Sequence, residues 1–446
     1  MNKYTHYKPS GLEWIKQVPE HWGIMPLFAC LSERYQKNIG GKFDKVFSLS
    51  YGRIVDRHVE SNFGLLPESF DTYQIVSKGN IIIRPTDLQN DKRSLRVGLV
   101  RSEEPGIITS AYIALEAVRN DSSCLFFYYL LHSYDLSKVL YGLGGGVRQS
   151  LKYSDLKRLL LPVPSTSEQH KIADFLEEVI PRINALIAQK KKMLGLLQEE
   201  LAVTINQSVT KGLDLDAPMK ESGIEWLGKI PSHWEIVKLT TYLESIVDYR
   251  GRTPNKISAG VFLVTARNVK NGIIDYSLSE EFVSIEEAEL FMKRGDVEIG
   301  DVLFTMEAPL GEAANVDRID ICLAQRLVKF RGQPDKLNNY FLKEWIRSHG
   351  FQNHLQSYAT GSTALGIKAS KLNQLIMVVP PLAEQARIVD SLTSCSERTN
   401  RAVTTINKEI IFLQEYRDAL VVEAVTGQID VRQYEPNFAL TAELVG

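Results

Sequence analysis

The chain contains two copies of one sequence pattern, and this duplication constrains its fold more than any other feature. The segment SGLEWIKQVPEHWGIMPL at Ser10–Leu27 recurs as SGIEWLGKIPSHWEIVKL at Ser222–Leu239. A second pattern recurs at Pro164–Leu176 and Pro380–Leu392, where Pro, Glu, Gln, Ile, Asp and Leu match in register. Because an internal repeat fixes the architecture before any single motif does, we expect two related globular parts with shared flanks.

Each copy ends in a long amphipathic segment. From Ile172 onward, apolar residues recur every three or four positions, with one interruption at Lys190. This spacing places them in one narrow stripe along a helix. We therefore predict a first helix over 167–209, about 64 Å long at ~1.5 Å per residue, with Ser167 as its N-cap. A second helix is predicted over 383–425. Pro181 should kink the first helix, because proline cannot donate the helical hydrogen bond.

The segments between the flanks keep the same layout although their sequences differ. Gly79–Ile83 parallels Gly300–Phe304 as a turn before a buried strand, and Ser110–Ile113 parallels Ala324–Leu327. Each copy is therefore predicted to be a mixed α+β globule followed by one long helix. The helices outreach a globule whose radius of gyration is roughly 15 Å. This favours an antiparallel coiled coil over the alternative in which each helix packs on its own globule.

The predicted fold class is α+β, with two α/β globules separated by two long helices and related by an internal pseudo-two-fold repeat. The polar segment Lys211–Ser222 contains a Gly and a Pro and is predicted to be the hinge between the copies. The boundaries we predict are 1–158 for the first globule, 159–214 for the first helix segment, 215–375 for the second globule, 376–430 for the second helix segment and 431–446 for a tail.

Composition excludes several classes of protein. The net charge of −2 argues against a nucleic-acid coat protein, whose affinity would come from bulk positive charge. No apolar run reaches the ~18 residues of a membrane span, and the polar start MNKYTHYKPS is not a signal peptide. The four cysteines form no CxxC pair, which is typical of reduced thiols in a cytosolic protein. We expect a cytoplasmic chain that contacts no membrane.

Catalytic motifs are missing from the sequence. The nearest approach to a phosphate-binding loop is Gly361–Lys368, but Ile367 stands where the second Gly should be followed directly by Lys. No H-E-x-x-H and no [DN]-P-P-[YFW] motif is present, and His58-Val59-Glu60 lacks the P-C-x-x-C that would complete a zinc deaminase signature. The duplicated His-Trp pairs are interpreted as turns that pack against the globule. We therefore predict no catalytic and no metal-binding residue in this chain.

Binding motifs are stronger than catalytic ones. Arg84–Arg101 contains five basic and two acidic residues, and Ile246–Gly272 contains five basic residues and one acidic residue. Charge alone would fit ordinary solvated loops, but Arg, Lys, Asn, Gln and Thr are also the side chains that contact phosphates and base edges. The residues that we predict to contact DNA are Arg84, Gln89, Asn90, Lys92, Arg93, Arg96, Arg148, Gln149 and Lys152 in the first copy, and Arg250, Arg252, Thr253, Arg267, Asn268, Lys270, Thr360, Thr363 and Lys368 in the second.

Together these motifs resemble the specificity subunit of type I restriction–modification systems over nearly the whole chain. The resemblance rests on the duplicated SG[LI]EW and P-x-H-W segments, on P-x-x-x-E-Q at each helix start, and on Gly300–Gly311 and Gly361–Lys368. The first copy departs from the second at Ser150, where the second has Gly366, and at Pro181. The resemblance implies a non-catalytic subunit whose two target recognition domains read a bipartite, asymmetric site in double-stranded DNA, with the helices as a spacer.

The same resemblance implies partners and cofactors outside this chain. Two methyltransferase subunits would dock on the helices and bring S-adenosylmethionine for N6-adenine methylation. It also allows two restriction subunits with ATP and Mg for cleavage. The candidate partner surface is Gln189, Lys190, Lys191 and Lys192. Two alternatives stay open, namely a structural adaptor that never reads bases and a self-sufficient DNA nuclease or methyltransferase.

Overall fold

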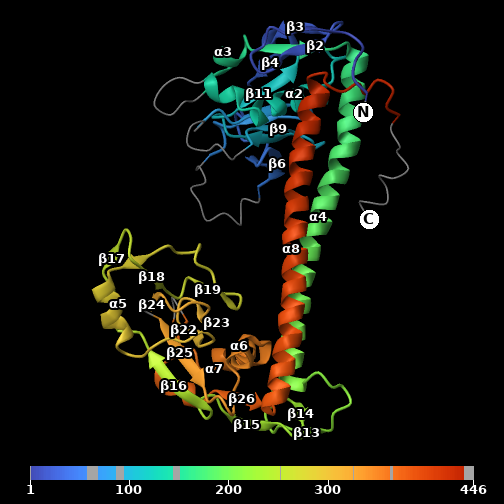
Figure 1. The fold of residues 1–446 in the computed structure, drawn as a ribbon. Coiled ribbons are helices and arrows are strands. Elements are labelled where there is room, and N and C mark those ends of the chain that lie inside the picture. The colour runs from blue at the N-terminus through green and yellow to red at the C-terminus, as the bar shows by residue number, and fades with distance from the viewer. Residues whose placement is uncertain are drawn as a thin grey trace. The chain divides into compact units, whose positions relative to one another are not determined.

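The computed structural model describes residues 2–57, 69–86, 95–143, 151–251, 253–324, 326–361 and 365–435. The chain divides into two compact units. Unit 1 consists of Met1–Lys191 with Lys408–Gly446, and unit 2 consists of Lys192–Asn407. Each unit holds one mixed α/β globule and parts of both long helices (Figure 1). The predicted boundaries treat each long helix as a segment of its own, whereas each unit contains parts of both helices. The two divisions are not comparable, so the predicted boundaries stay a prediction.

The two long helices lie close to their predicted positions. Helix α4 runs over Thr166–Lys211 and helix α8 over Leu382–Val425. The predicted N-cap is wrong, because the Ser165 hydroxyl, not that of Ser167, accepts a hydrogen bond from the Glu168 N–H at 3.4 Å. The helix therefore begins one residue earlier than predicted. Pro181 lies inside α4, and the kink remains a prediction.

Helices α4 and α8 run antiparallel in both units (Figure 1). In unit 1, Asn184 of α4 accepts a hydrogen bond from Arg417 at 3.0 Å, and Lys190 lies 2.6 Å from Glu409. Residue numbers thus rise along α4 where they fall along α8. In unit 2, the end of α4 shares a buried apolar cluster with the start of α8. The predicted antiparallel pairing is confirmed.

A four-stranded antiparallel sheet forms the centre of each globule, and its strand order is the same in both units. Unit 1 has the order β4 (Leu31–Arg34), β11 (Ile113–Ala117), β8 (Ile81–Ile83) and β9 (Val97–Leu99). Unit 2 has the order β16 (Leu243–Asp248), β25 (Leu327–Gly332), β22 (Val302–Met306) and β23 (Leu310–Asn315). This common order confirms the internal repeat.

Strand register corrects one detail of the repeat. Ile83 and Phe304 are equivalent, because each lies four residues after the turn glycine of its copy. Ile83 pairs with Ile113, whereas Phe304 pairs with Val328. The equivalent of Ile113 is therefore Val328 and not its neighbour Leu327. Leu327 and Val328 are both apolar and both buried, so hydrophobicity alone could not show which of them is equivalent to Ile113.

The duplicated flanks form small sheets that connect each globule to its long helix. Strand β3 (Gly23–Pro26) pairs with β12 (Leu160–Val163), and β15 (Glu235–Lys238) pairs with β26 (Ile376–Val379). In the same way β1 (Tyr7–Pro9) pairs with β2 (Gln17–Pro19), and β13 (Met219–Glu221) pairs with β14 (Lys229–Pro231). Because β13 lies inside the predicted hinge, the second repeat begins before Ser222.

Shorter elements complete the globules. Those of unit 1 are α1 (Leu27–Cys30), β5 (Phe47–Ser50), β6 (Arg53–Asp56), β7 (Gln74–Val76), β10 (Gly106–Ile108), α2 (Cys124–Leu136), η2 (Val139–Gly142) and α3 (Tyr153–Leu156). Those of unit 2 are β17 (Lys256–Ile257), β18 (Val261–Val264), β19 (Val269–Lys270), β20 (Ile273–Ile274), β21 (Phe282–Val283), α5 (Ile285–Met292), β24 (Ile321–Leu323), α6 (Asn339–Arg347), α7 (His349–Ser357) and η3 (Ala369–Gln374).

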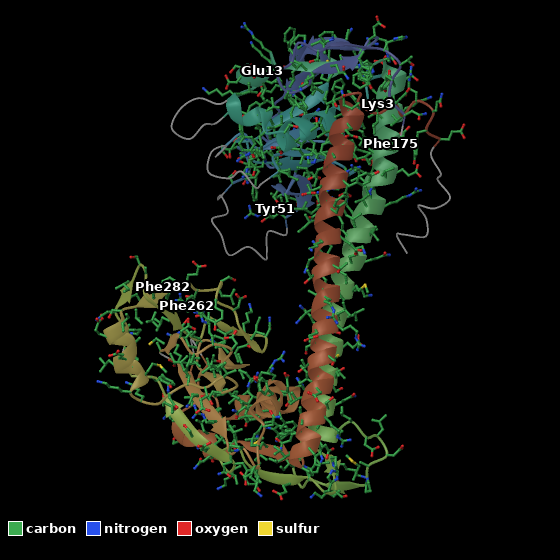
Figure 2. The ribbon with its side chains drawn as sticks, viewed as in Figure 1. Lys3, Glu13, Tyr51, Phe175, Phe262 and Phe282 are labelled. Carbon is green, nitrogen blue, oxygen red and sulfur yellow. The ribbon has the colours of Figure 1, made fainter. Side chains whose placement is uncertain are left out.

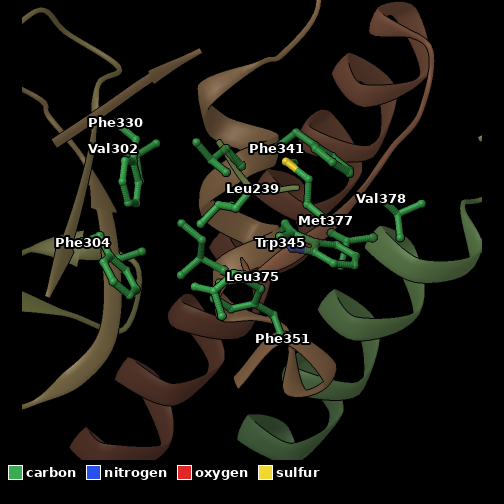
Figure 3. Close-up of a cluster of buried hydrophobic side chains, with 14 of the residues drawn as sticks. Leu239, Val302, Phe304, Phe330, Phe341, Trp345, Phe351, Leu375, Met377 and Val378 are labelled. Carbon is green, nitrogen blue, oxygen red and sulfur yellow. The ribbon is translucent and has the colours of Figure 1, made fainter. Parts of the chain in front are cut away.

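The core of unit 2 is built from aromatic and aliphatic side chains of its sheet, its helices and the long helix pair. Figure 3 shows Trp345 of α6 packed beside Met377 and Leu375, all three fully buried. Each large side chain buried in this way stabilises the fold by ~1.5–3 kcal/mol. A further aromatic contact joins β18 and β21, where the ring centroids of Phe262 and Phe282 are 5.4 Å apart (Figure 2). Among the described residues, no helix is both long and apolar enough to cross a membrane.

Candidate nucleic-acid interface

A carboxylate at the start of α4 holds the duplicated His-Trp turn of unit 1. Glu168 is 4% exposed and accepts hydrogen bonds from the Trp22 indole at 3.2 Å and from the Tyr4 hydroxyl at 2.6 Å. Its second carboxylate oxygen lies 2.9 Å from Nε2 of His21. Burial and the neighbouring carboxylate both raise the pKa of Tyr4, so its hydroxyl remains a donor.

The same arrangement recurs at the start of α8. Oε2 of Glu384 accepts a hydrogen bond from the Trp234 indole at 3.1 Å and lies 2.8 Å from Nε2 of His233. The His-Trp turns are therefore packing turns, as predicted, but their hydrogen bonds go to the starts of the long helices, whereas the prediction placed them against the globule. The two contacts attach each globule to its own long helix.

The glutamine of each P-x-x-x-E-Q motif makes a second attachment. Gln169 accepts a hydrogen bond from the Ser123 N–H at 3.2 Å, immediately before α2. Gln385 accepts one from the Asn338 N–H at 2.8 Å, immediately before α6. An amide side chain can accept and donate at once, and both glutamines also donate to the carbonyl of the motif proline. Each long helix start is thus bonded to the N-cap residue of a helix in its globule, α2 in unit 1 and α6 in unit 2.

Three segments of unit 2 meet at one edge of the β22–β25 sheet. Glu307 of the β22–β23 turn forms a β-bridge with Gly366, which also bridges to Thr360. The Met306 N–H donates to the carbonyl of Arg326, between β24 and β25, at 2.8 Å. The structure therefore brings together the two motifs Gly300–Gly311 and Gly361–Lys368, which are far apart in the sequence. We call this edge the turn edge of unit 2.

A small cavity of about 120 Å³ lies at the turn edge. Its charged and hydroxyl side chains come from Thr253, Lys256, Thr265, Arg267, Glu281 and Arg326. Three cations face one carboxylate, which lies 2.9 Å from Lys256 and 3.8 Å from Arg267. The side chain of Arg267 is 72% exposed. Exposed cations among hydroxyl groups suit contacts with phosphates and base edges, and the cavity is smaller than typical small-molecule sites.

The remaining candidates of unit 2 divide into exposed and paired side chains. Lys270, Thr360 and Lys368 are exposed. Arg250 is half-buried and donates to both oxygens of Asp248, the shortest contact being 2.6 Å. Burial alone would raise the pKa of Asp248, but the Arg250 hydrogen bonds hold it below its usual value. Any contact of Arg250 with DNA would therefore compete with this pair. Arg252 and Thr363 lie outside the described residues.

The corresponding edge of unit 1 has the same backbone connection. The Leu151 N–H donates to the Pro85 carbonyl at 2.9 Å, as the Ile367 N–H does to Met306 at 3.0 Å. Arg84, at the end of β8, is half-buried, and Lys152 is exposed at the start of α3. The candidates that lie outside the described residues of this unit are Gln89, Asn90, Lys92, Arg93, Arg148 and Gln149.

The structure places two of the predicted DNA contacts inside a globule. Arg96 is fully buried, and its Nε donates to the Tyr141 hydroxyl at 3.2 Å. Asn268 is also fully buried, and its amide donates to the backbone carbonyls of Asp275 at 3.1 Å and Ser279 at 3.0 Å. Both side chains satisfy polar groups inside a globule, and buried polar groups require such partners. A count of charged residues in a sequence window could not distinguish them from exposed ones.

Sequence reasoning also missed residues of the turn edge. Lys256 lies inside the basic window of the second copy and Glu307 inside the motif Gly300–Gly311, but neither is among the residues predicted to contact DNA. Arg326 lies beyond that basic window, and only the fold places it beside Met306. A search of turns that follow buried strands would have found both Glu307 and Arg326.

The predicted partner surface on α4 is only partly free. Lys190 is paired with Glu409 of α8 in unit 1, while Gln189, Lys191 and Lys192 are exposed. A stronger apolar signal was missed. Leu196 of α4 is 53% exposed and Phe412 of α8 is 72% exposed, and the repeat register that matches Leu176 with Leu392 makes these two positions equivalent. Large exposed side chains at equivalent places indicate two similar contact sites.

The described part of the chain contains no group of three or more His, Cys, Asp or Glu side chains that could hold a metal ion. Its four cysteines are free thiols.

The fold defines a class of protein in which two related α/β globules, with one strand order in common, are each attached to a pair of long antiparallel helices. The family model described as "Type I restriction modification DNA specificity domain" matches residues 67–195 and 231–411. The chain belongs to this family, whose members act in DNA sequence specificity. It is therefore a non-catalytic recognition subunit.

Individual relatives and solved structures agree with this assignment. The MjaVIII specificity subunit of a type I restriction enzyme from Methanocaldococcus jannaschii is 23% identical over 432 residues, which covers 93% of this chain and 95% of the relative. The EcoBI specificity subunit from Escherichia coli is 20% identical, covering 73% of this chain and 70% of the relative. A chain from a type I R-M complex superposes with a TM-score of 0.69 at 16% identity, covering 92% of this chain and 99% of that one. The HsdS subunit from Thermoanaerobacter tengcongensis gives 0.54 at 16% identity, covering 92% and 98%.

Proposed function

We propose that the chain reads a bipartite, asymmetric site in double-stranded DNA, with one half-site bound by each unit. The observation that supports this most strongly is that the two globules share one sheet order but differ in the side chains at their turn edges. A repeated backbone can present two readers to DNA with approximate two-fold symmetry, and different side chains make the combined site asymmetric.

Within each half-site, exposed cations would bind phosphates while shorter polar side chains approach base edges. In unit 2, Arg267 and Lys256 suit the phosphates, Thr253 lines the same cavity, and Lys270, Thr360 and Lys368 are further exposed candidates of the unit. In unit 1, Lys152 and Arg84 remain candidates together with the predicted residues outside the described ranges.

We further propose that the helix pair binds two methyltransferase subunits, one in each unit. Leu196 and Phe412 would be the apolar centres of the two contacts, because they are equivalent in the repeat and exposed in both units. Lys191 and Lys192 would add charge near the first of these sites. The partners would supply S-adenosylmethionine and methylate adenine at N6, and two restriction subunits with ATP and Mg could join the complex in the cytoplasm.

The test is a reconstitution of the chain with its methyltransferase subunit on a random-sequence DNA library. Sequencing of N6-methyladenine should give one bipartite motif with an unspecified spacer, and either subunit alone should give no methylation. Methylation without sequence preference would favour a structural adaptor, and turnover by the chain alone would favour a self-sufficient enzyme.

A further inference from the structure

Arg326 occupies an unusual backbone conformation at the turn edge of unit 2. Its φ is +75°, in the left-handed region that side chains other than glycine rarely adopt. Such residues cost of order 1–3 kcal/mol and cluster at functional sites. The next residue, Leu327, begins β25 and is fully buried, so the strand fixes the place from which the arginine side chain leaves the sheet.

Glu307 holds the guanidinium of Arg326 at the same edge. The Arg326 Nε lies 3.4 Å from Oε1 of Glu307, and both side chains are 49% exposed. Glu307 is itself fixed by its β-bridge to Gly366. A Cβ at Gly366 would lie 3.1 Å from the Glu307 Cβ, which is closer than side chains usually approach, so a glycine at this position permits the contact. The pair is therefore positioned by backbone on both sides while it stays accessible.

The chemistry of the pair matches one kind of ligand. A guanidinium fork donates two parallel hydrogen bonds, and O6 with N7 of guanine is the base edge that accepts them in the major groove. A carboxylate beside it can orient the fork and can accept from the amino group of cytosine. The neighbouring cations Arg267 and Lys256 supply the positive field that phosphates require.

The first copy keeps the backbone of this edge but lacks the pair. Pro85 and Met306 are equivalent, because each accepts the hydrogen bond described above, so Glu307 corresponds to Thr86. Ile113 and Val328 are equivalent by strand register, so Arg326 corresponds to Ala111. A pair needed for folding would be expected in both copies. Its presence in one copy only is what a residue that distinguishes the two half-sites requires.

We propose that Arg326, oriented by Glu307, reads a guanine in the half-site bound by unit 2. Arg326 is the specificity-determining residue and Glu307 is its positioning residue. This inference rests on the proposed function, because it needs each unit to read one half-site.

The experiment compares full-length variants reconstituted with the methyltransferase subunit on the random-sequence library. Arg326→Ala should lower discrimination at one G·C position of one half-site by about tenfold to a hundredfold, with the other half-site unchanged. Arg326→Lys keeps the charge but not the fork, so it should retain DNA affinity and still lose discrimination at that position. Glu307→Gln should relax the same position to a smaller extent.

Arg318→Ala is the matched control. Arg318 is an arginine of the same unit with similar exposure, 46%, but it pairs with Asp320 and stacks on Tyr276. This variant should keep the complete wild-type motif. If Arg326→Ala also keeps the wild-type motif, or if Arg318→Ala relaxes the same position, the inference is overturned. A wild-type complex without any sequence preference would instead overturn the proposed function, so the two failures are distinguishable.

Discussion

The Trp22 indole donates a hydrogen bond to the Glu168 carboxylate across 3.2 Å, and Trp234 makes the equivalent bond to Glu384 across 3.1 Å. The partners are far apart in the sequence, one in the flank before the globule and the other at the start of the long helix after it. The parts of the two copies that stay similar in sequence are thus the parts that touch. The parts that differ include the exposed turns, where a change of side chain leaves the attachment intact.

Removal of the Glu168 carboxylate should destabilise unit 1. Glu168→Ala would leave the buried indole of Trp22 and the hydroxyl of Tyr4 without an acceptor, and hydrogen bonds to a charged group contribute ~1.5–3 kcal/mol each. We expect a loss of about 2–4 kcal/mol in the free energy of unfolding, measured by urea titration. Glu199→Ala, on an exposed position of α4, is the control. Equal transition midpoints for both variants would contradict the structural role.

A buried ion pair distinguishes the sheet of unit 2 from that of unit 1. Lys329 is fully buried and lies 3.4 Å from Asp301. The equivalent positions of unit 1 carry Asn80 and Ala114 by turn alignment and strand register. Burial alone would raise the pKa of Asp301, but hydrogen bonds from Arg331 hold it below its usual value. The aspartate therefore stays charged at neutral pH and compensates the buried lysine.

This pair predicts strong coupling between two substitutions. Asp301→Asn should cost about 3–5 kcal/mol, because it leaves the buried Lys329 ammonium with only the exposed Asp296 carboxylate at 3.7 Å and weakens the Arg331 hydrogen bonds to Asp301. The double variant Asp301→Asn/Lys329→Ala recreates the pair found in unit 1 and should recover the part of that loss that comes from the uncompensated lysine, whereas the part that comes from Arg331 should remain. A double-mutant cycle by chemical denaturation measures the coupling. Additive effects of the two single substitutions would show that the pair contributes nothing as a unit.

The sequence predicted the long helices closely, but it could not show which of the candidate contact side chains are exposed. A stripe of apolar residues depends on helical periodicity alone, so both ends of α8 were predicted to within one residue. The choice of DNA contacts depended on which face of a short strand or turn is exposed. Arg96 precedes β9 and Asn268 precedes β19, and their hydrogen bonds inside the globule come from residues distant in the sequence or across a turn. Local charge carries no information about such partners.

The contact between Glu307 and Arg326 at the turn edge could not be predicted from the sequence either. Glu307 and Arg326 meet because β22 and β25 are neighbours in the sheet, and strand pairing is a tertiary property. The recurrence of the flanks, by contrast, was visible in the sequence and correctly gave the two-copy architecture. What the sequence lacked was the register that makes Ala111 the counterpart of Arg326.

A half-buried histidine of α2, His132, predicts how the stability of unit 1 depends on pH. Nδ1 of His132 is buried and has no hydrogen-bond partner within the described residues. Burial lowers the pKa of His132 to about 4, whereas the unfolded chain has a pKa of about 6.5. The folded state therefore binds fewer protons between these values. The stability that the neutral His132 contributes is therefore fully present above pH ~6.5 and is lost as the pH falls toward 4.

The wild-type chain should lose about 2 kcal/mol of unfolding free energy from this group between pH 7 and pH 5. His132→Phe keeps a ring beside Tyr128, which stacks on the imidazole, and should remove that part of the pH dependence. His170→Phe changes an exposed histidine and serves as the control. Identical pH profiles for His132→Phe and the wild type would assign the loss of stability to other groups.

Two exposed apolar side chains of the helix pair, Leu196 and Phe412, are the proposed binding surface for a methyltransferase subunit. Phe412→Ser removes an apolar side chain that is 72% exposed, so the free chain should keep its unfolding temperature. If a methyltransferase subunit covers this residue, the affinity should fall by about tenfold to a hundredfold, because burying a large apolar side chain contributes ~1.5–3 kcal/mol. Leu196→Ser should weaken the equivalent site of unit 2 in the same way, and the double variant should bind neither copy of the partner.

Calorimetric titration of the chain with the methyltransferase subunit gives both the affinity and the number of sites. Ile411→Ser, at an exposed neighbouring position, tests whether the effect is specific to the face that the repeat duplicates. Full affinity and two occupied sites in the double variant would place the docking surface elsewhere on the chain.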